Sequence, residues 1–239
     1  MILPTIRASL SRSDAQHLIG LLGRSDPDLG ESASVRLERH GLDSVLDDPR
    51  VLNALLTESD VTVRPSVIYY VLVRQTLLEG GLEDRETADY VASVLSAFGH
   101  AGRAYKISPE AEGEFHYLVD MVSELRTAEG RKRFLLRVHM GDFSLWMAGL
   151  FPDYLEARAS RKGAPSIAYF EELGADGYRS ASESPEAAEL GLEGIFRGVA
   201  DHFTSVRTAL NRISDRHFWP ASGNPVGRLL REVSGYAGP

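Results

Sequence analysis

Apolar residues recur along most of the chain at the three-and-four spacing of one helix face. The pattern is clear between Asp84 and Gly99, where it comprises Ala88, Val91, Val94, Leu95 and Phe98. Side-chain acceptors also stand before first-turn prolines, as is typical of helix starts, at Asp48-Pro49, Ser108-Pro109 and Ser184-Pro185. The sequence therefore predicts an all-α fold, a compact multi-helix bundle.

One segment, residues 67–73, has the β-branched and aromatic composition of a strand. Its flanks favour a helix, because Pro65 suits a first helical turn and Gly80-Gly81 suits a helix end. A strand would also need partners, and neither apolar–polar alternation nor Asn-Gly hairpin turns occur elsewhere in the sequence. We therefore predict a helix here.

Two longer amphipathic patterns predict the later helices. The first runs from Pro109 to about Thr127, with Phe115, Leu118, Val119, Val122 and Leu125 on one side and Glu112, His116, Asp120 and Glu124 on the other. The polar row favours a solvated face over a ladder of metal ligands. The second runs from Pro185 to Phe218 and predicts a long C-terminal spine helix, with the stripe Leu192, Phe196, Val199, Phe203, Val206, Leu210 and Ile213. The stripe suits a monomer core and a dimer seam equally well.

Composition narrows the class of protein. The 239 residues are 43% hydrophobic and 25% charged, which is the balance of a globular protein. A formal net charge of -8 gives no global positive field, so nucleic acid is not the expected partner and could only be bound locally, through the arginines. The absence of cysteine excludes disulfides, thiolate metal sites and cysteine nucleophiles.

The organisation along the chain predicts one all-α domain over residues 1–239, with 99–108 as the place where two lobes would divide. Met1–Arg7 lacks the basic region and apolar run that secretion requires. The most apolar stretch, Phe143–Phe151, has about half of the roughly 20 residues needed to cross a bilayer. We therefore expect a cytoplasmic protein with no membrane partner, and we interpret this stretch as a buried core helix.

A first candidate site lies where His139 and Asp142 precede that apolar stretch, three residues apart. On one helix face, Asp142 could orient the His139 imidazole as a general base or ligand, with Trp146 and neighbouring aromatics around it. The structural alternative is favoured: Gly141 breaks the helix, Asp142 caps the next one, and His139 bonds a backbone carbonyl. Small residues at 141, 144 and 148 fall on one side, where another helix could approach closely.

A second candidate site consists of two basic clusters that bracket the same stretch. Arg126, Arg131, Lys132, Arg133 and Arg137 precede it, and Arg158, Arg161 and Lys162 follow it. Arg133, Arg137, Arg158 and Arg161 could together hold an anionic ligand or an acidic partner. With three lysines against 23 arginines in the chain, arginine usage can also be a codon habit, and a solvated face is favoured. The aromatics beyond, Tyr154, Tyr169, Phe170 and Tyr178, suit the core, with groove lining as the alternative.

Several of these residues carry a resemblance to known sequences. Gly141-Asp142-Phe143-Ser144-Leu145, Gly149-Leu150-Phe151-Pro152, and Ala168 to Gly174 with Tyr178 resemble a block found in a family of uncharacterised bacterial proteins. The block spans about a sixth of the chain. The resemblance implies a bacterial origin and no particular activity.

Common catalytic and metal-binding patterns do not occur. The sequence has no Gly-x-Ser-x-Gly, Walker loop, Gly-x-Gly-x-x-Gly or His-Glu-x-x-His. None of its seven histidines has Glu three residues earlier, and no two lie four apart, as metal sites of helical bundles require. We therefore predict no catalytic residue, no metal and no cofactor.

These observations favour a protein that acts through protein–protein contacts, in a regulatory or adaptor role. Its partner would be another protein or a second copy of itself, which makes a homodimer one expected form. The competing hypothesis is an enzyme or small-molecule binder whose pocket lies near His139, Asp142 and Trp146, because the interior of a bundle can hold ligands between facing helices.

Overall fold

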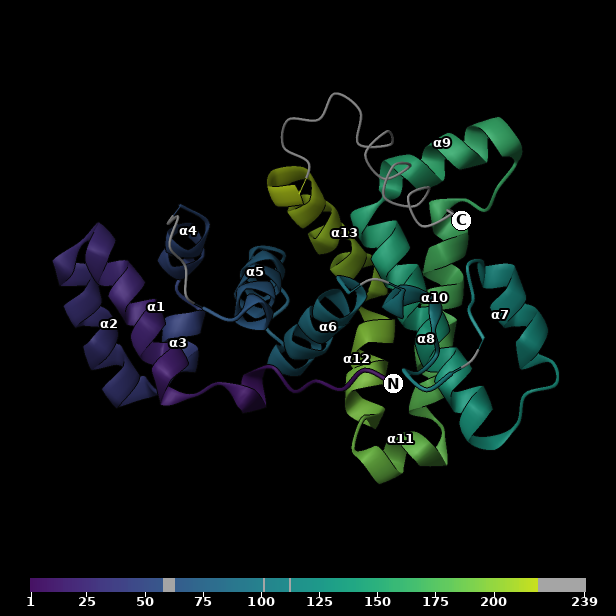
Figure 1. The fold of residues 1–239 in the computed structure, drawn as a ribbon, viewed down its shortest axis with the longest axis horizontal. Helices are drawn as coiled ribbons and strands as arrows, with labels where there is room; N and C mark the ends of the chain where they lie inside the picture. Colours follow the sequence, from purple (N-terminus) through teal and green to yellow (C-terminus); the bar gives the residue numbers. More distant parts are fainter. Residues whose placement is uncertain (58–62, 101, 112, 219–239) are drawn as a thin grey trace. The chain divides into compact units, whose positions relative to one another are not determined.

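The computed structural model describes residues 1–57, 63–100, 102–111 and 113–218. These residues form α-helices joined by short connections and contain no strand, which confirms the all-α prediction (Figure 1). None of the helices within these ranges combines the length and the apolar character needed to cross a membrane.

The chain separates into two compact units. One comprises Ile2–Ala97, and the other comprises Phe98–Pro239 together with Met1. The single-domain organisation over residues 1–239 stays a prediction, and each unit is described by itself below.

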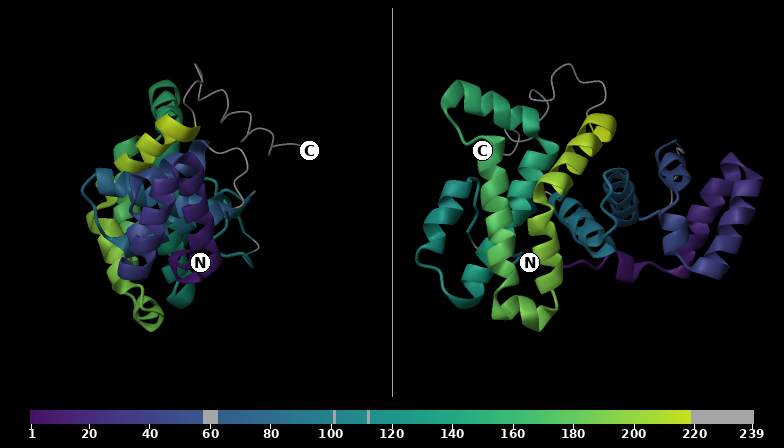
Figure 2. Two further views of the ribbon diagram at one scale, coloured as in Figure 1. Left: turned by 90° about the vertical axis from the view of Figure 1, so that its left-hand side faces the viewer. Right: turned by 180° about the vertical axis from the view of Figure 1, so that it is seen from behind.

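The described residues of the first unit form a 3-10 turn and six helices: η1 (Arg7–Ser9), α1 (Arg12–Ser25), α2 (Pro27–His40), α3 (Asp43–Leu46), α4 (Pro49–Thr57), α5 (Pro65–Glu79) and α6 (Arg85–Phe98), whose last residue belongs to the second unit. Helices α1 and α2 lie side by side in both views (Figures 1 and 2). Their backbones meet at Gly23 and Gly30, since a Cβ on Gly30 would lie 2.8 Å from the Cα of Gly23. Helix α5 confirms the helical prediction for 67–73. Its middle turns are buried on nearly all sides, which accounts for their strand-like composition.

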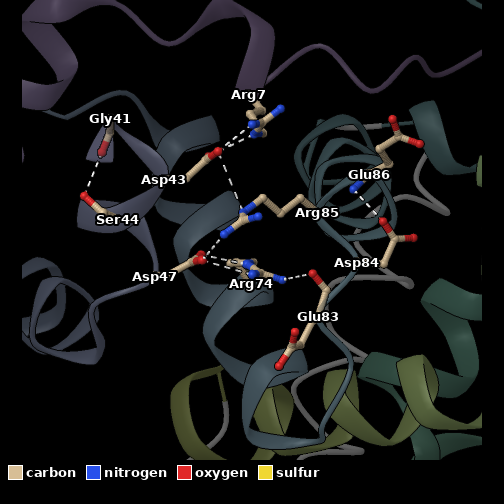
Figure 3. A network of polar contacts seen from close by, with 10 residues as sticks. All are labelled: Arg7, Gly41, Asp43, Ser44, Asp47, Arg74, Glu83, Asp84, Arg85 and Glu86. Atoms are coloured by element: carbon tan, nitrogen blue, oxygen red, sulfur yellow. Dashed lines mark hydrogen bonds and ion pairs between the residues drawn. The ribbon is translucent and has the colours of Figure 1, made fainter. Parts of the chain in front are cut away.

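A network of ion pairs connects α3, α5 and α6 of the first unit (Figure 3). The buried Arg74 donates from Nε and Nη2 to the Asp47 carboxylate, at 2.7 and 3.0 Å, and from Nη1 to the Glu83 carbonyl at 2.7 Å. Arg85 adds a third bond to Asp47 at 2.6 Å. Burial alone would raise the pKa of Asp47, but these hydrogen bonds outweigh it and hold the pKa below its usual range. The network compensates the buried guanidinium and needs no ligand to do so.

The second unit is arranged around the long helix α8 (Gly130–Leu150). Around it lie η2 (Arg103–Tyr105), α7 (Leu118–Leu125), α9 (Pro152–Lys162), α10 (Ile167–Ser182), α11 (Pro185–Leu190), α12 (Glu193–Asp201), α13 (Phe203–Ile213) and the π-helical turn η3 (Ser214–Phe218). Helices α10 and α13 both run beside α8 (Figures 1 and 2). The predicted core helix over 143–151 is thus confirmed for 143–150, which belong to a largely buried helix, whereas Phe151 lies just beyond its end.

Small residues let α8 and α10 approach closely, as the sequence predicts for positions 141 and 144. A Cβ on Gly174 would lie 2.7 Å from the Cβ of Ser144, and a Cβ on Gly177 would lie 2.7 Å from the Arg137 carbonyl oxygen. The ring of Tyr178 fills the space beside Gly141, where an added Cβ would meet it at 2.7 Å. The two helix backbones are therefore in near contact.

The C-terminal carbonyls of α8 are satisfied by side chains from the last helical segments. Asn211 donates from Nδ2 to the carbonyls of Ala148 and Gly149, at 2.9 and 2.7 Å. Ser214 donates to the carbonyl of Leu150 at 2.7 Å. These bonds allow α8 to end inside the protein without unpaired backbone groups.

The predicted long C-terminal spine helix is wrong in its continuity. Gly191 adopts φ +67, which ends α11, and the N–H of Leu192 turns back to the carbonyl of Ala187 at 2.9 Å. A second break at His202 separates α12 from α13. The predicted stripe is nevertheless buried throughout, at Leu192, Phe196, Val199, Phe203, Val206, Leu210 and Ile213.

The predicted helix from Pro109 to Thr127 is also wrong, because α7 begins only at Leu118. The described residues before it form turns and other non-helical backbone, and the N–H of Phe115 donates to the carbonyl of Tyr105 at 2.7 Å. Val119, expected on the apolar side, is 62% exposed. The predicted polar row therefore does not form as one helix face, and Glu112 lies outside the described residues.

Candidate functional site

The structure corrects the local interpretation of His139 and Asp142. Helix α8 runs without a break from Gly130 to Leu150, so Gly141 does not end a helix and Asp142 does not cap one. Both polar side chains are 2% exposed, in the middle turns of a buried helix. The glycine at position 141 leaves room for the Tyr178 ring that packs on it, and it does not end a helix.

The side chains of His139 and Asp142 lie in different surroundings. The Asp142 carboxylate accepts a hydrogen bond from the Tyr178 hydroxyl of α10 at 2.8 Å. The His139 ring packs between Phe98 and Phe143, with centroid distances of 6.0 and 6.3 Å, and within the described ranges its buried Nε2 has no hydrogen-bond partner. Burial lowers the pKa of His139 to about 3, so the imidazole is neutral at physiological pH. This environment is that of a core group.

Trp146, one turn further along α8, connects this aromatic core to a surface pocket. Its indole lies edge-on to Phe98 at 5.6 Å and to Phe151 at 5.0 Å, and it packs near Phe143 at 6.2 Å. Trp146 is only partly buried, and both Phe143 and Trp146 line the pocket. The sequence hypothesis placed a pocket near His139, Asp142 and Trp146. The structure has a cavity beside Trp146, but neither His139 nor Asp142 lines it.

The pocket has a volume of about 390 Å³ and belongs entirely to the second unit. Helices α7, α8 and α9, the loop after α9 and the start of α10 form its walls. Its lining is dominated by aromatic and aliphatic side chains: Tyr105, His116, Tyr117, Leu118, Val119, Phe143, Trp146, Met147, Tyr154, Leu155, Arg158, Ala164, Pro165 and Phe170. Two of them, Tyr117 and Val119, are 53% and 62% exposed and form an apolar rim.

Arg158 is the one permanently charged side chain among the described residues that line the pocket. Its guanidinium carbon lies 5.7 Å from the centroid of the Tyr117 ring and 5.5 Å from that of Tyr154. Nη1 also donates to the Tyr154 hydroxyl at 3.0 Å. Two aromatic faces and one hydrogen bond thus orient the cation within an otherwise apolar pocket.

The loop before α7 completes the pocket with a second aromatic pair. The rings of Tyr105 and His116 lie 4.4 Å apart and are inclined by 37°. His116 Nε2 is 3.3 Å from a Glu114 oxygen, and Lys106 Nζ is 3.9 Å from the other oxygen of the same carboxylate. This wall is therefore formed by a non-helical loop where the sequence predicted a helix.

The two predicted basic clusters do not converge on one site. Arg133 is exposed in the first turns of α8, and Arg137 donates to the carbonyl of Ser180 at 3.3 Å. Arg158 and Arg161 lie on α9, beyond the other end of α8, and Arg161 is exposed. At 1.5 Å per residue, Arg133 is about 25 Å along α8 from its C-terminal end. The side chain of Lys162 lies outside the described set.

Sequence reasoning found only part of the pocket. It singled out Trp146 and Arg158, and it offered groove lining as an alternative for Tyr154 and Phe170. It missed Tyr105, Tyr117 and Met147, for which no local signal existed, and it placed His116 on a helix that does not form. Within the described ranges no cluster of three or more potential ligands suits a metal ion.

The pocket is the main feature of this protein that bears on its function, because no similarity to a known protein does so. No family model, no curated protein and no solved structure matches this chain. The resemblance of residues 141–178 to a family of uncharacterised bacterial proteins stays a prediction.

Proposed function

We propose that the protein binds a small, largely apolar molecule in the aromatic pocket between α7, α8 and α9. The observation that carries the proposal is the pocket itself, with about 390 Å³ of space and a lining of aromatic rings and aliphatic side chains. Ligand pockets in proteins typically measure about 300–1,000 Å³ and combine apolar walls with a few polar groups. Small-molecule binding is thus the function that this geometry favours.

Binding without catalysis suits the chemistry of the lining. Among the described lining residues, Arg158 and His116 carry the ionisable nitrogens and three tyrosines carry hydroxyl groups, whereas none carries a carboxylate, a thiol or an amine. His139 and Asp142 lie behind the Phe143 wall and do not reach the pocket. A general acid–base site needs groups within hydrogen-bond reach of the reacting atoms, and these groups are not so placed.

Contact with another protein, or with a second copy of this chain, is a second candidate function. It is supported by the exposed apolar rim of Tyr117 and Val119. The two candidates differ in the size of the occupant. Native mass spectrometry of the protein purified from its own host separates them, because a retained small molecule adds a mass far below that of a protein chain.

The pocket can be tested directly with N-phenylnaphthylamine, a neutral aromatic probe whose fluorescence rises in apolar surroundings. We expect saturable binding to the wild-type protein and at least tenfold weaker binding to Ala164→Phe, because the added ring occupies the pocket that Ala164 lines. Ala168→Phe is the matched control, since Ala168 is exposed a few residues away and does not line the pocket. Equal binding to both variants, or no binding to the wild type, would refute the proposal.

A further inference from the structure

The charge in the aromatic pocket indicates what kind of molecule it holds. We propose that the ligand is an amphipathic anion: an apolar body ending in one carboxylate, sulfonate or phosphate group, with Arg158 binding that group. This inference rests on the proposed function, because it names the ligand class for the same pocket.

The first support is the unmatched charge of Arg158. Two other arginines that are buried or partly buried meet carboxylates: Arg74 lies 2.7 Å from Asp47, and Arg207 lies 2.6 Å from Glu171. Among the described residues no carboxylate lies within ion-pair distance of Arg158, whose polar contact is the Tyr154 hydroxyl. A partly buried guanidinium is stabilised by an anion. The pocket therefore offers a place for an anion that the protein does not itself supply.

The second support is geometric. The faces of Tyr117 and Tyr154 hold the guanidinium, and one N–H is used by the Tyr154 hydroxyl. A guanidinium has five N–H donors in a planar fork, so donors remain for a two-point contact with an oxyanion. The aromatic stacking reduces the conformational freedom that Arg158 would lose when it binds.

The third support is the absence of repulsion in the pocket. Its lining contains no aspartate or glutamate within the described part of the chain. Glu114, on the wall loop, is already matched by Lys106 and His116. An anionic group can thus enter beside Arg158 while the body of the ligand contacts Trp146, Met147 and Phe170.

The experiment compares N-phenylnaphthylamine with anilinonaphthalene sulfonate, which has the same aromatic body plus one sulfonate. We expect the wild-type protein to bind the anionic probe about tenfold more tightly, because its sulfonate accepts charge-assisted hydrogen bonds from Arg158 and the neutral probe has no group in that place. The preference should shrink as salt is raised, because the pocket is open to solvent and ions screen the contact.

Two variants with the same change in net charge identify the arginine responsible. Arg158→Gln should bind both probes with equal affinity, whereas Arg161→Gln should keep the wild-type preference, because Arg161 lies on the same helix but not in the lining. Arg158→Lys, which keeps the charge and loses the fork, should retain part of the preference. Circular dichroism of each variant shows whether the helical content is unchanged.

The outcomes separate this inference from the proposed function. If the wild type binds both probes equally, or if both glutamine variants lose the preference together, the role of Arg158 is refuted while the pocket stands. If Arg158→Gln fails to fold, the relative affinity of the wild-type protein for the two probes still tests whether the pocket prefers an anion. If the wild type binds neither probe, the proposed function itself is refuted.

Discussion

The close approach of α8 and α10 makes a sharp prediction for Gly177→Ala. A Cβ at position 177 would lie 2.7 Å from the Arg137 carbonyl oxygen and 3.3 Å from the Gly141 nitrogen. Both atoms belong to the backbone of α8 and cannot rotate aside. Because Cβ atoms keep at least 3.0 Å from other heavy atoms, α10 must move by 0.3 Å or more, and contacts along the interface lengthen together.

The expected size of the effect follows from two opposed contributions. Overpacking of a well-filled interface costs about 1–3 kcal/mol, and a backbone obstacle favours the upper part of that range. Alanine returns up to about 1 kcal/mol through its better helix propensity. We therefore expect Gly177→Ala to lower the free energy of unfolding by about 1–2 kcal/mol.

The matched control is Gly194→Ala, in α12 of the same unit. No heavy atom lies within 4 Å of a Cβ built at Gly194, so this variant gains propensity without a clash. Urea unfolding followed by tryptophan fluorescence reports on this unit, because Trp146 lies on its central helix α8. The two variants should differ by about 2 kcal/mol. If Gly177→Ala is as stable as Gly194→Ala, the argument from close helix packing is refuted.

Three further predictions concern buried polar groups. Tyr178→Phe should lower the free energy of unfolding by about 1.5–3 kcal/mol, because it removes a buried hydrogen bond to the Asp142 carboxylate; an unchanged urea midpoint would contradict this. Burial tends to raise the pKa of Asp14, but hydrogen bonds from Ser11 and Arg64 lower it to about 2, so its contribution to stability is present above pH 4 and is lost as the pH falls toward 2. Thermal unfolding of Asp14→Asn across this range should therefore depend less on pH than that of the wild type. His139 has a pKa of about 3 in the folded protein and about 6.5 in the unfolded chain, so only the unfolded chain takes up a proton as the pH falls below 6.5. The free energy of unfolding should therefore be about 1.4 kcal/mol lower at pH 5.5 than at neutral pH. Urea unfolding of His139→Phe should not show this decrease.

Helix type and the buried faces could be predicted because both depend on local patterns. The spacing between Asp84 and Gly99, and the flanks of 67–73, identify helices from adjacent residues alone. The C-terminal stripe likewise marks a buried face correctly. The predicted continuity was wrong at two points: the apolar spacing continues in phase through the break at His202, from Val199 to Phe203, and the break at Gly191 lies before the stripe begins. Such breaks are set by the left-handed glycine and by packing on α8 and α10, which a stripe does not reveal.

The candidate site was harder to predict, because its chemistry is assembled from elements distant in sequence. His139 and Asp142 attracted attention as polar residues in an apolar run, yet tertiary packing places one in an aromatic core and the other against Tyr178. Arg158 resembled its neighbour Arg161 in sequence, and only the positions of Tyr117 and Tyr154 distinguish them. A residue's role in the pocket thus depends on its neighbours in the folded protein, which the spacing of apolar residues along the sequence does not identify.

The largest local error and the best candidate site coincide, and the structure gives a physical reason. Ser108-Pro109 has the chemistry of a helix start, but the backbone stays non-helical until Leu118. A helix over the whole segment would direct Phe115 and Val119 to the same apolar side, whereas Val119 now stands on an exposed rim and Tyr105 stacks on His116 in the wall. The pocket therefore exists because this segment departs from its local preference, as sequences do where binding competes with regular structure.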